Sequence, residues 1–257
     1  MKVLFIGDVI GRPGRAAVRD FLQRHQKGWT LVVANGENAA GGRGLTEETA
    51  RELFNAGVHG LTTGNHIWDR KEAFVLLDRD RRIIRPANYA EELPGAGLMF
   101  LPSGDGRELA VINLSGRAFM GSYMDCPFRR AEVLVKKASS RTPYILVDFH
   151  GEATSEKRAF LYHMDGKVSC ILGTHTHVQT ADEQVSDRGT GYITDAGMTG
   201  PQDSVLGMKV QPCLDRFLLS VPSRMETADG RVRLCGVSVE MDEQGRAKSI
   251  ERVSEMI

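Results

Sequence analysis

Short apolar runs alternate with segments of helical periodicity along most of the chain. Runs with strand character occupy residues 2–6, 30–34, 60–63, 144–149, 168–172 and 192–194. Segments with helical character occupy residues 15–25, 46–56, 70–78 and 128–139. Late in the chain, residues 231–241 and 247–253 flank a polar turn and predict an antiparallel hairpin. This order of elements predicts an α/β protein whose mixed sheets are covered by helices.

Residues 83–125 break this regular alternation. Prolines and glycines interrupt the stretch repeatedly, yet residues 98–101 and 109–114 within it keep strand character. We expect either an extension of a sheet or a small cap here, inside a single domain that spans residues 1–257.

The composition is ordinary for a soluble globular protein, with 41% hydrophobic and 26% charged residues. Lys and Arg together number 33, as do Asp and Glu, so the overall charge gives no reason to expect bulk nucleic-acid binding. No apolar stretch approaches the roughly 18–20 residues of a membrane span, and the N-terminal run is too short for a signal peptide. The 4 cysteines lack metal-binding or disulfide spacing. We therefore expect a reduced, cytoplasmic protein without a membrane partner; a homo-oligomer is compatible with the sequence.

Polar side chains with metal-binding chemistry follow five apolar runs, each beside a glycine. These sites are residues 7–8, 35–38, 64–66, 149–151 and 173–177. In α/β folds, ligands gather at the carboxyl ends of strands. Five such sites in one chain are hard to explain as packing, so we expect them to meet at one edge of the sheets.

The residue types at these sites suit a mixed oxygen and nitrogen metal centre without thiolate. The candidate ligands are Asp8, Glu37, Asn38, Asn65, His150, His175 and His177. Taken singly, each has an ordinary structural explanation, such as a helix cap, a turn or a satisfied buried histidine. Because His175 and His177 are two residues apart, an extended segment would point both imidazoles to the same side. Jointly, the residues predict a dinuclear metal hydrolase.

The order of these motifs resembles that of the calcineurin-like metallophosphoesterases. That family has an Asp after strand one, an acid after strand two, Gly-Asn-His, a single His and Gly-x-His-x-His. The corresponding residues here are Asp8, Glu37, residues 64–66, His150 and residues 173–177. The match spans most of the chain.

The chain departs from the wider family at three places. Ile10 replaces the histidine of the usual Asp-x-His, the second acid is Glu37 within Asn-Gly-Glu-Asn, and Ile67 follows Gly-Asn-His where an acid is usual. With the segments at residues 7–15 and 195–201, these departures make the chain resemble the bacterial YmdB-type subfamily.

The resemblance implies a four-layer fold, in which helices flank two mixed sheets, and phosphodiesterase activity on cyclic nucleotides, notably 2′,3′-cyclic ones. It also implies two metal ions per chain, with iron favoured and manganese or zinc as alternatives. The implied ligands of one metal are Asp8, Glu37, Asn38 and His177. The implied ligands of the other are Glu37, Asn65, His150 and His175, so that Glu37 bridges the two. Asn38 is the candidate to replace the histidine that is missing at Ile10.

Two metals about 3.5–4 Å apart lower the pKa of a shared water and clamp phosphate oxygens, so a metal hydroxide is the expected nucleophile. His66 is next to Asn65 and can donate a proton to the leaving oxygen. Arg12 and Arg15, at a predicted helix start, could meet a substrate phosphate, and a solvent-facing turn is equally compatible. Asp195 is a candidate to orient a ligand histidine.

Two other functions remain open from the sequence. The same metal core could serve a phosphomonoesterase or 5′-nucleotidase, because the core chemistry does not select the ester. A metal-binding regulatory protein without turnover is the third hypothesis. An amidohydrolase fits poorly, since its His-x-His normally lies on the first strand and here it comes late.

Overall fold

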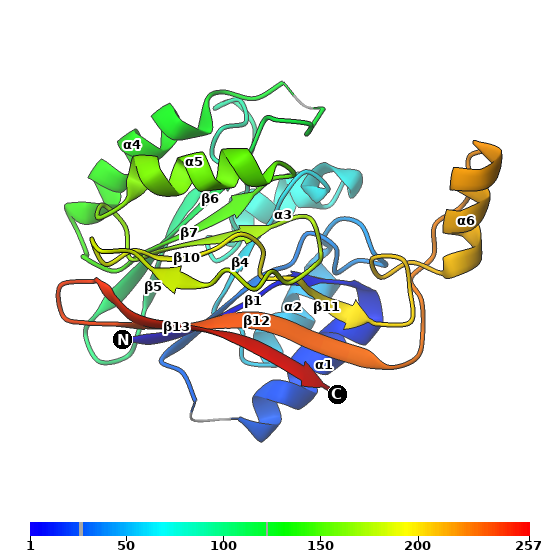
Figure 1. Ribbon diagram of the computed structural model, residues 1–257, viewed down its shortest axis with the longest axis horizontal. Coiled ribbons are helices and arrows are strands. Elements are labelled where there is room, and N and C mark those ends of the chain that lie inside the picture. The colour runs from blue at the N-terminus through cyan, green and yellow to red at the C-terminus, as the bar shows by residue number, and fades with distance from the viewer. Residues whose placement is uncertain (26–27, 122) are drawn as a thin grey trace.

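The structure, a computed structural model, describes residues 1–25, 28–121 and 123–257. Two β-sheets pack face to face, and helices lie over the outer face of each sheet (Figure 1). The predicted four-layer α/β sandwich is confirmed. No helix within the described residues is both long and apolar enough to cross a membrane.

The first sheet has seven strands and combines parallel and antiparallel pairs. In spatial order it contains β2 (Asp8–Val9), β11 (Met198–Pro201), β12 (Val232–Met241), β1 (Lys2–Ile6), β3 (Leu31–Asn35) and β4 (Gly60–Thr62), with β13 (Ala247–Met256) paired to β12. The strands β1, β3 and β4 run parallel to one another, so their carboxyl ends meet at one edge. The predicted C-terminal hairpin is confirmed as the antiparallel pair of β12 and β13.

The second sheet has six strands. In spatial order it contains β5 (Leu98–Pro102), β6 (Glu108–Ser115), β7 (Ile145–His150), β8 (Cys170–Thr174), β10 (Gly191–Ile193) and β9 (Gln184–Val185). The strands β6, β7, β8 and β10 are parallel, and β5 pairs antiparallel with β6 at one end. The irregular stretch at residues 83–125 thus contributes two strands to this sheet.

The apolar runs are continuous because both faces of the central strands are buried. In β1, Val3 and Phe5 face the second sheet, where they share a core with Leu146. Leu4 and Ile6 face the opposite way, into the cluster formed with the helices. This double burial explains why the strands show no polar alternation.

Three helices pack on the outer face of the seven-stranded sheet: α1 (Gly11–Arg24), α2 (Glu47–Asn55) and α3 (Ala73–Arg79). Two others, α4 (Pro127–Ser139) and α5 (Thr154–Met164), cover the six-stranded sheet. Helix α6 (Val210–Leu219) differs, because it stands away from both sheets (Figure 1).

The hydrophobic pattern predicts neither α5 nor α6, and it misses the short strands β2, β9 and β11. The buried face of α5 consists of Lys157, Phe160, Leu161 and Met164, so a lysine interrupts the apolar stripe that signals a helix. Only Cys213 is buried in α6, which therefore has no core-facing stripe.

The helix predicted at residues 70–78 begins at Ala73, after a separate 3₁₀ turn, η1 (Ile67–Asp69).

Candidate metal centre

The predicted ligands lie together where the two sheets meet at their carboxyl edges. Asp8, Glu37 and Asn65 follow β1, β3 and β4 of the seven-stranded sheet. His150 ends β7 of the other sheet, and His175 follows β8. Most of these side chains are buried, with Asp8 and His150 both fully inaccessible. Both sheets therefore contribute to one polar cluster.

Three ligand-type atoms converge on one imidazole nitrogen. The Nε2 atom of His150 lies 2.9 Å from Asn65 Oδ1, 3.2 Å from Glu37 Oε1 and 3.2 Å from His175 Nδ1. Ligand atoms of Glu37, His150 and His175 all lie within 4.8 Å of one another. This spacing is compact enough for a single cation.

The hydrogen bonds behind His150 show which ring nitrogen is available. The hydroxyl of Thr174 donates to Asp148 at 2.6 Å, so it accepts from His150 Nδ1, which lies 2.9 Å away. In a neutral ring, Nε2 then carries a lone pair. It faces the oxygens of Glu37 and Asn65, which also present only lone pairs. Without a positive charge these atoms would repel one another, and a cation would satisfy all of them.

A second group of donors lies beside the first. The buried Asp8 Oδ1 has no hydrogen-bond partner within the described residues and lies 3.8 Å from His177 Nε2. An unpaired buried carboxylate oxygen is costly, and a metal ion would satisfy it. The amide nitrogen of Asn38 lies 3.1 Å from Glu37 Oε1 and 3.3 Å from His177 Nε2. Turning this amide would present its oxygen instead, since the two ends have nearly the same shape. These residues fit a second cation.

The electrostatics of the cluster also favour a positive charge. Burial opposes ionisation of Glu37, but the neighbouring His150 and two hydrogen bonds hold its pKa at about 2. Burial opposes a charged His150, but the carboxylate of Glu37 raises its pKa to about 9. Burial and the charge of His150 lower the pKa of His175 to about 3. Without metal, His150 thus holds a proton at the place where a metal-bound site would hold a cation. Metal binding would release this proton.

The loop after β8 is not extended, so the prediction that both histidines point to one side of an extended segment is wrong. His175 and His177 have positive φ values of 100° and 66°, which are uncommon for residues other than glycine. The resulting turn directs His175 toward His150 and His177 toward Asp8. One short loop therefore reaches both groups of donors.

A buried ion pair holds this turn in place. The ammonium of Lys157 lies 3.0 Å from Asp195 Oδ2 and 2.8 Å from the carbonyl oxygen of Thr174. The same carboxylate oxygen accepts from the amide and hydroxyl of Thr176, at 3.0 and 2.7 Å. Asp195 contacts the residue between the two histidines, so its orienting role would act through Thr176 and not through an imidazole.

Replacing Lys157 by Met is expected to lower the free energy of unfolding by about 3–5 kcal/mol, because Asp195 is left as an uncompensated buried charge. Urea denaturation followed by circular dichroism measures this change. The double variant Lys157→Met/Asp195→Asn should recover part of the loss, and Lys136→Met, at an exposed position of α4, should have little effect. A cost below about 1 kcal/mol for the single variant would contradict a structural role for the pair.

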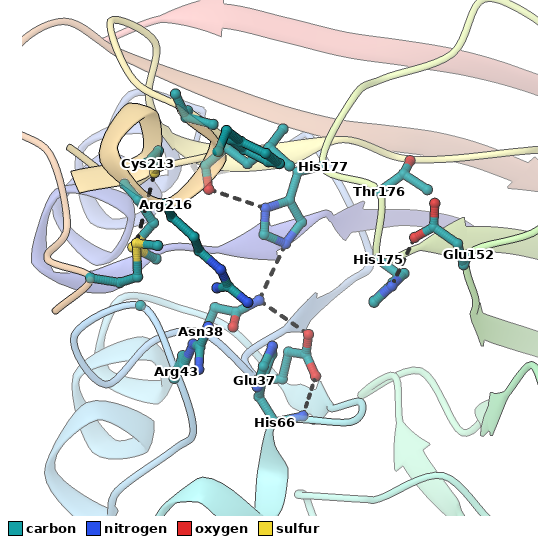
Figure 2. Close-up of a pocket in the computed structure, with 16 residues that line it drawn as sticks. Glu37, Asn38, Arg43, His66, Glu152, His175, Thr176, His177, Cys213 and Arg216 are labelled. Carbon is teal, nitrogen blue, oxygen red and sulfur yellow. Dashed lines mark hydrogen bonds and ion pairs between the residues drawn. The ribbon is translucent and has the colours of Figure 1, made fainter. Parts of the chain in front are cut away.

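A pocket of about 450 Å³ lies over the cluster. Its polar side includes Glu37, Asn38, His66 and both histidines of the β8 loop (Figure 2). The Nδ1 atom of His66 lies 3.0 Å from Asp69 Oδ2, and its backbone N–H donates to Glu37 at 3.1 Å. Asp69 thereby fixes the ring at Nδ1 and leaves Nε2 available to a ligand.

Two arginines also line this pocket, Arg43 and Arg216. Figure 2 shows Arg216 reaching from α6 toward Asn38 and Glu37. Neither guanidinium forms a hydrogen bond or ion pair with another described residue. Unpaired guanidinium groups beside a buried polar cluster are suited to binding an anionic ligand.

The chain has clear relatives among known proteins. A family model described as YmdB-like protein matches residues 4–253. The chain belongs to the YmdB-like family. A 2′,3′-cyclic-nucleotide 2′-phosphodiesterase of Bacillus subtilis (strain 168) is 46% identical over 256 residues, which cover 98% of this chain and 96% of the relative.

Two solved structures resemble this YmdB-like protein over its whole length. A hypothetical protein from Thermus thermophilus superimposes with a TM-score of 0.94 at 41% identity, covering 100% of this chain and 99% of the other. A novel phosphatase from Mycoplasma pneumoniae superimposes with a TM-score of 0.92 at 31% identity, covering 100% and 93%. The two-sheet architecture is therefore shared by relatives from different bacteria.

In this YmdB-like protein, the arginines that the sequence suggests for substrate binding lie in other surroundings. The Nε atom of Arg15 lies 2.5 Å from Glu52 Oε2, in an ion pair between α1 and α2. Arg12 is exposed in the first turn of α1. The pocket is lined by Arg43 and Arg216 instead. The glycine-rich loop around Arg43 is a sequence signal for a flexible pocket edge, whereas nothing in the pattern marks Arg216.

Ile10, which stands where the wider family has histidine, has a packing role in this YmdB-like protein. Its side chain is fully buried and fills the space beside Gly200 and Gly207. Position 10 therefore offers no metal-binding side chain. The amide of Asn38 lies beside His177 and Glu37.

Proposed function

We propose that this YmdB-like protein is a metal-dependent phosphodiesterase that hydrolyses 2′,3′-cyclic nucleotides. The observation that carries the proposal is the buried set of lone-pair donors around His150 Nε2 and Asp8 Oδ1, at the floor of a pocket that also contains His66. The substrate class is supported by the name of the Bacillus subtilis relative, which matches 98% of the chain.

In this proposal the cluster would hold two cations, and Glu37 would serve as a ligand of both. One set of ligands is Asp8, Glu37, Asn38 and His177, and the other is Glu37, Asn65, His150 and His175. When bound, such a pair of cations would supply an activated water and neutralise phosphate oxygens. Iron is the favoured metal, with manganese or zinc as alternatives, because the donors are oxygen and imidazole nitrogen.

The side chains of the pocket supply the other requirements of the reaction. The oxygen of water adds to phosphorus, one of the two ester bonds of the ring breaks, and the departing ribose oxygen needs a proton. We assign that proton to Nε2 of the doubly protonated His66 ring, whose Nδ1–H donates to the carboxylate of Asp69. Arg43 and Arg216 are placed to pair with the charge of the phosphate.

A phosphomonoesterase is a second candidate, because the Mycoplasma pneumoniae structure is described as that of a phosphatase. The two functions differ in the charge of the substrate. A monoester brings a terminal dianion, whereas a cyclic diester brings a single charge and a leaving oxygen that stays attached to the product.

The test compares turnover of 2′,3′-cyclic AMP with that of a phosphomonoester such as 3′-AMP, with metal content determined on the same sample. We expect about two metal ions per chain and selective opening of the cyclic diester. Preferential hydrolysis of the monoester would favour the phosphatase, and two metals with no turnover would favour a regulatory protein. A protein that binds no metal after iron or manganese is supplied would overturn the proposal.

A further inference from the structure

The pocket has an apolar wall that the proposed chemistry does not use. Six apolar or sulfur-containing residues form this apolar wall: Val205, Leu206, Met208, Cys213, Phe217 and Met225. In Figure 2, Cys213 and His175 lie on opposite sides of the pocket, and Arg216 lies between them. The pocket is therefore polar and charged at one side and apolar at the other.

The apolar wall is attached to the proposed metal centre and does not form a separate surface. The carbonyl oxygen of Leu206 accepts a hydrogen bond from His177 Nδ1 at 3.3 Å. The methyl group of Met208 lies where a side chain at Gly42 would begin, so this wall packs against the loop that follows Glu37. A ligand in contact with the metal centre would thus also contact the wall.

Phe217 is the most exposed side chain of this wall. It is 79% exposed although it lines the pocket, because α6 stands away from the sheets (Figure 1). Exposed large apolar side chains that border a site often mark a binding surface. An aromatic ring at a pocket edge offers a flat face on which another ring can stack.

A nucleoside cyclic phosphate has the same two-sided character as the pocket. Its anionic phosphate suits the metal centre with Arg43 and Arg216, and its flat base suits an apolar wall with an aromatic ring. We propose that the apolar wall is a nucleobase subsite in which Phe217 stacks on the base. This inference rests on the proposed function, and it adds that the preferred substrates are nucleoside phosphates and not cyclic phosphates in general.

The chemistry of the wall also predicts its selectivity. Stacking accepts any of the four bases, because every base has a π-face, whereas discrimination between bases requires hydrogen bonds to their edges. Apolar side chains and a thiol provide few such bonds. The four 2′,3′-cyclic nucleotides should therefore react with similar kcat/KM, with a modest advantage for the larger purines.

The experiment measures Phe217→Ala against two substrates with manganese-loaded protein: 2′,3′-cyclic AMP, and glycerol 1,2-cyclic phosphate, which has no base. Stacking contributions predict a loss of about tenfold in kcat/KM for the nucleotide, mostly through KM, and no change for the glycerol compound. Phe217→Trp should retain the nucleotide preference. Leu219→Ala is the matched control, since Leu219 is 65% exposed on the same helix and does not line the pocket.

Binding of 3′-AMP, measured by calorimetry, tests the subsite without turnover. It should weaken by a similar factor in Phe217→Ala and remain unchanged in Leu219→Ala. Equal kcat/KM of the wild type on both cyclic substrates, or equal losses on both in Phe217→Ala, would overturn the subsite while the proposed function stands. An inactive wild type whose 3′-AMP binding still depends on Phe217 would support the subsite and overturn the proposed function.

Discussion

Replacing Glu37 by Gln is expected to lower turnover of 2′,3′-cyclic AMP by about 10³-fold and to reduce the metal content of the purified protein. Glutamine keeps the shape but removes the charge of the residue proposed to bridge both cations. One oxygen of Glu37 faces His150 and Asn38, and the other accepts from the backbone of His66. Metal assistance is worth several kcal/mol of transition-state stabilisation, and each 1.4 kcal/mol, roughly, is a factor of ten.

Steady-state kinetics and plasma mass spectrometry on the same samples measure both effects of this substitution. Glu48→Gln is the matched control, because Glu48 is an exposed acid in the first turn of α2. It should retain wild-type activity and metal. A Glu37→Gln protein with full metal content and more than about a tenth of wild-type activity would exclude the bridging role.

Replacing His66 by Ala is expected to lower turnover by about 10²–10⁴-fold while metal content stays at the wild-type level, because general acid catalysis has this magnitude. The hydrogen bond from residue 66 to Glu37 uses the backbone N–H, which alanine keeps. The loss should be much smaller on bis(p-nitrophenyl) phosphate, since p-nitrophenolate leaves without a proton. The comparison of these two substrates separates proton donation from metal binding.

Asp69→Asn tests how the ring of His66 is positioned. Asparagine can still contact Nδ1, which lies 3.0 Å from the carboxylate, but it lacks the negative charge that favours the doubly protonated ring, so a loss of about tenfold with a shifted pH profile is expected. His163→Ala, at a histidine that pairs with Glu132 outside the pocket, should leave turnover unchanged.

For the His66→Ala variant, a parallel loss of metal and activity would instead identify His66 as a metal ligand.

The strands that carry the centre are predictable from sequence because they are buried on both faces. The runs that lead to Ile6 and Asn35 are continuous apolar segments, and only Asp148 interrupts the run that leads to His150; the end of each places a polar residue at the same edge. Helix α5 is not predictable in this way, because its core-facing lysine is understood only once its partner Asp195 is known. Long-range polar pairs of this kind leave no periodic signal.

The proposed ligand set is accessible to sequence reasoning, whereas the rest of the pocket is not. Polar residues at the ends of parallel strands must meet, whatever the loops between them do. Arg216 and Phe217 reach the pocket on α6, whose direction depends on loops at both of its ends and on no sheet register. The positive φ values of His175 and His177 are equally hidden, because glycine is the usual residue in such turns.

The position of the cluster between two sheets has a consequence for the protein as a whole. Cations held by Asp8 and Glu37 on one side and by His150 and His175 on the other would cross-link the two halves of the sandwich, much as a disulfide joins distant segments. Ligands that bind only the folded state add to its stability in proportion to the logarithm of their concentration. Metal supply would then govern the lifetime of the folded chain as well as its rate of catalysis, and a chelator would weaken the architecture along with the chemistry.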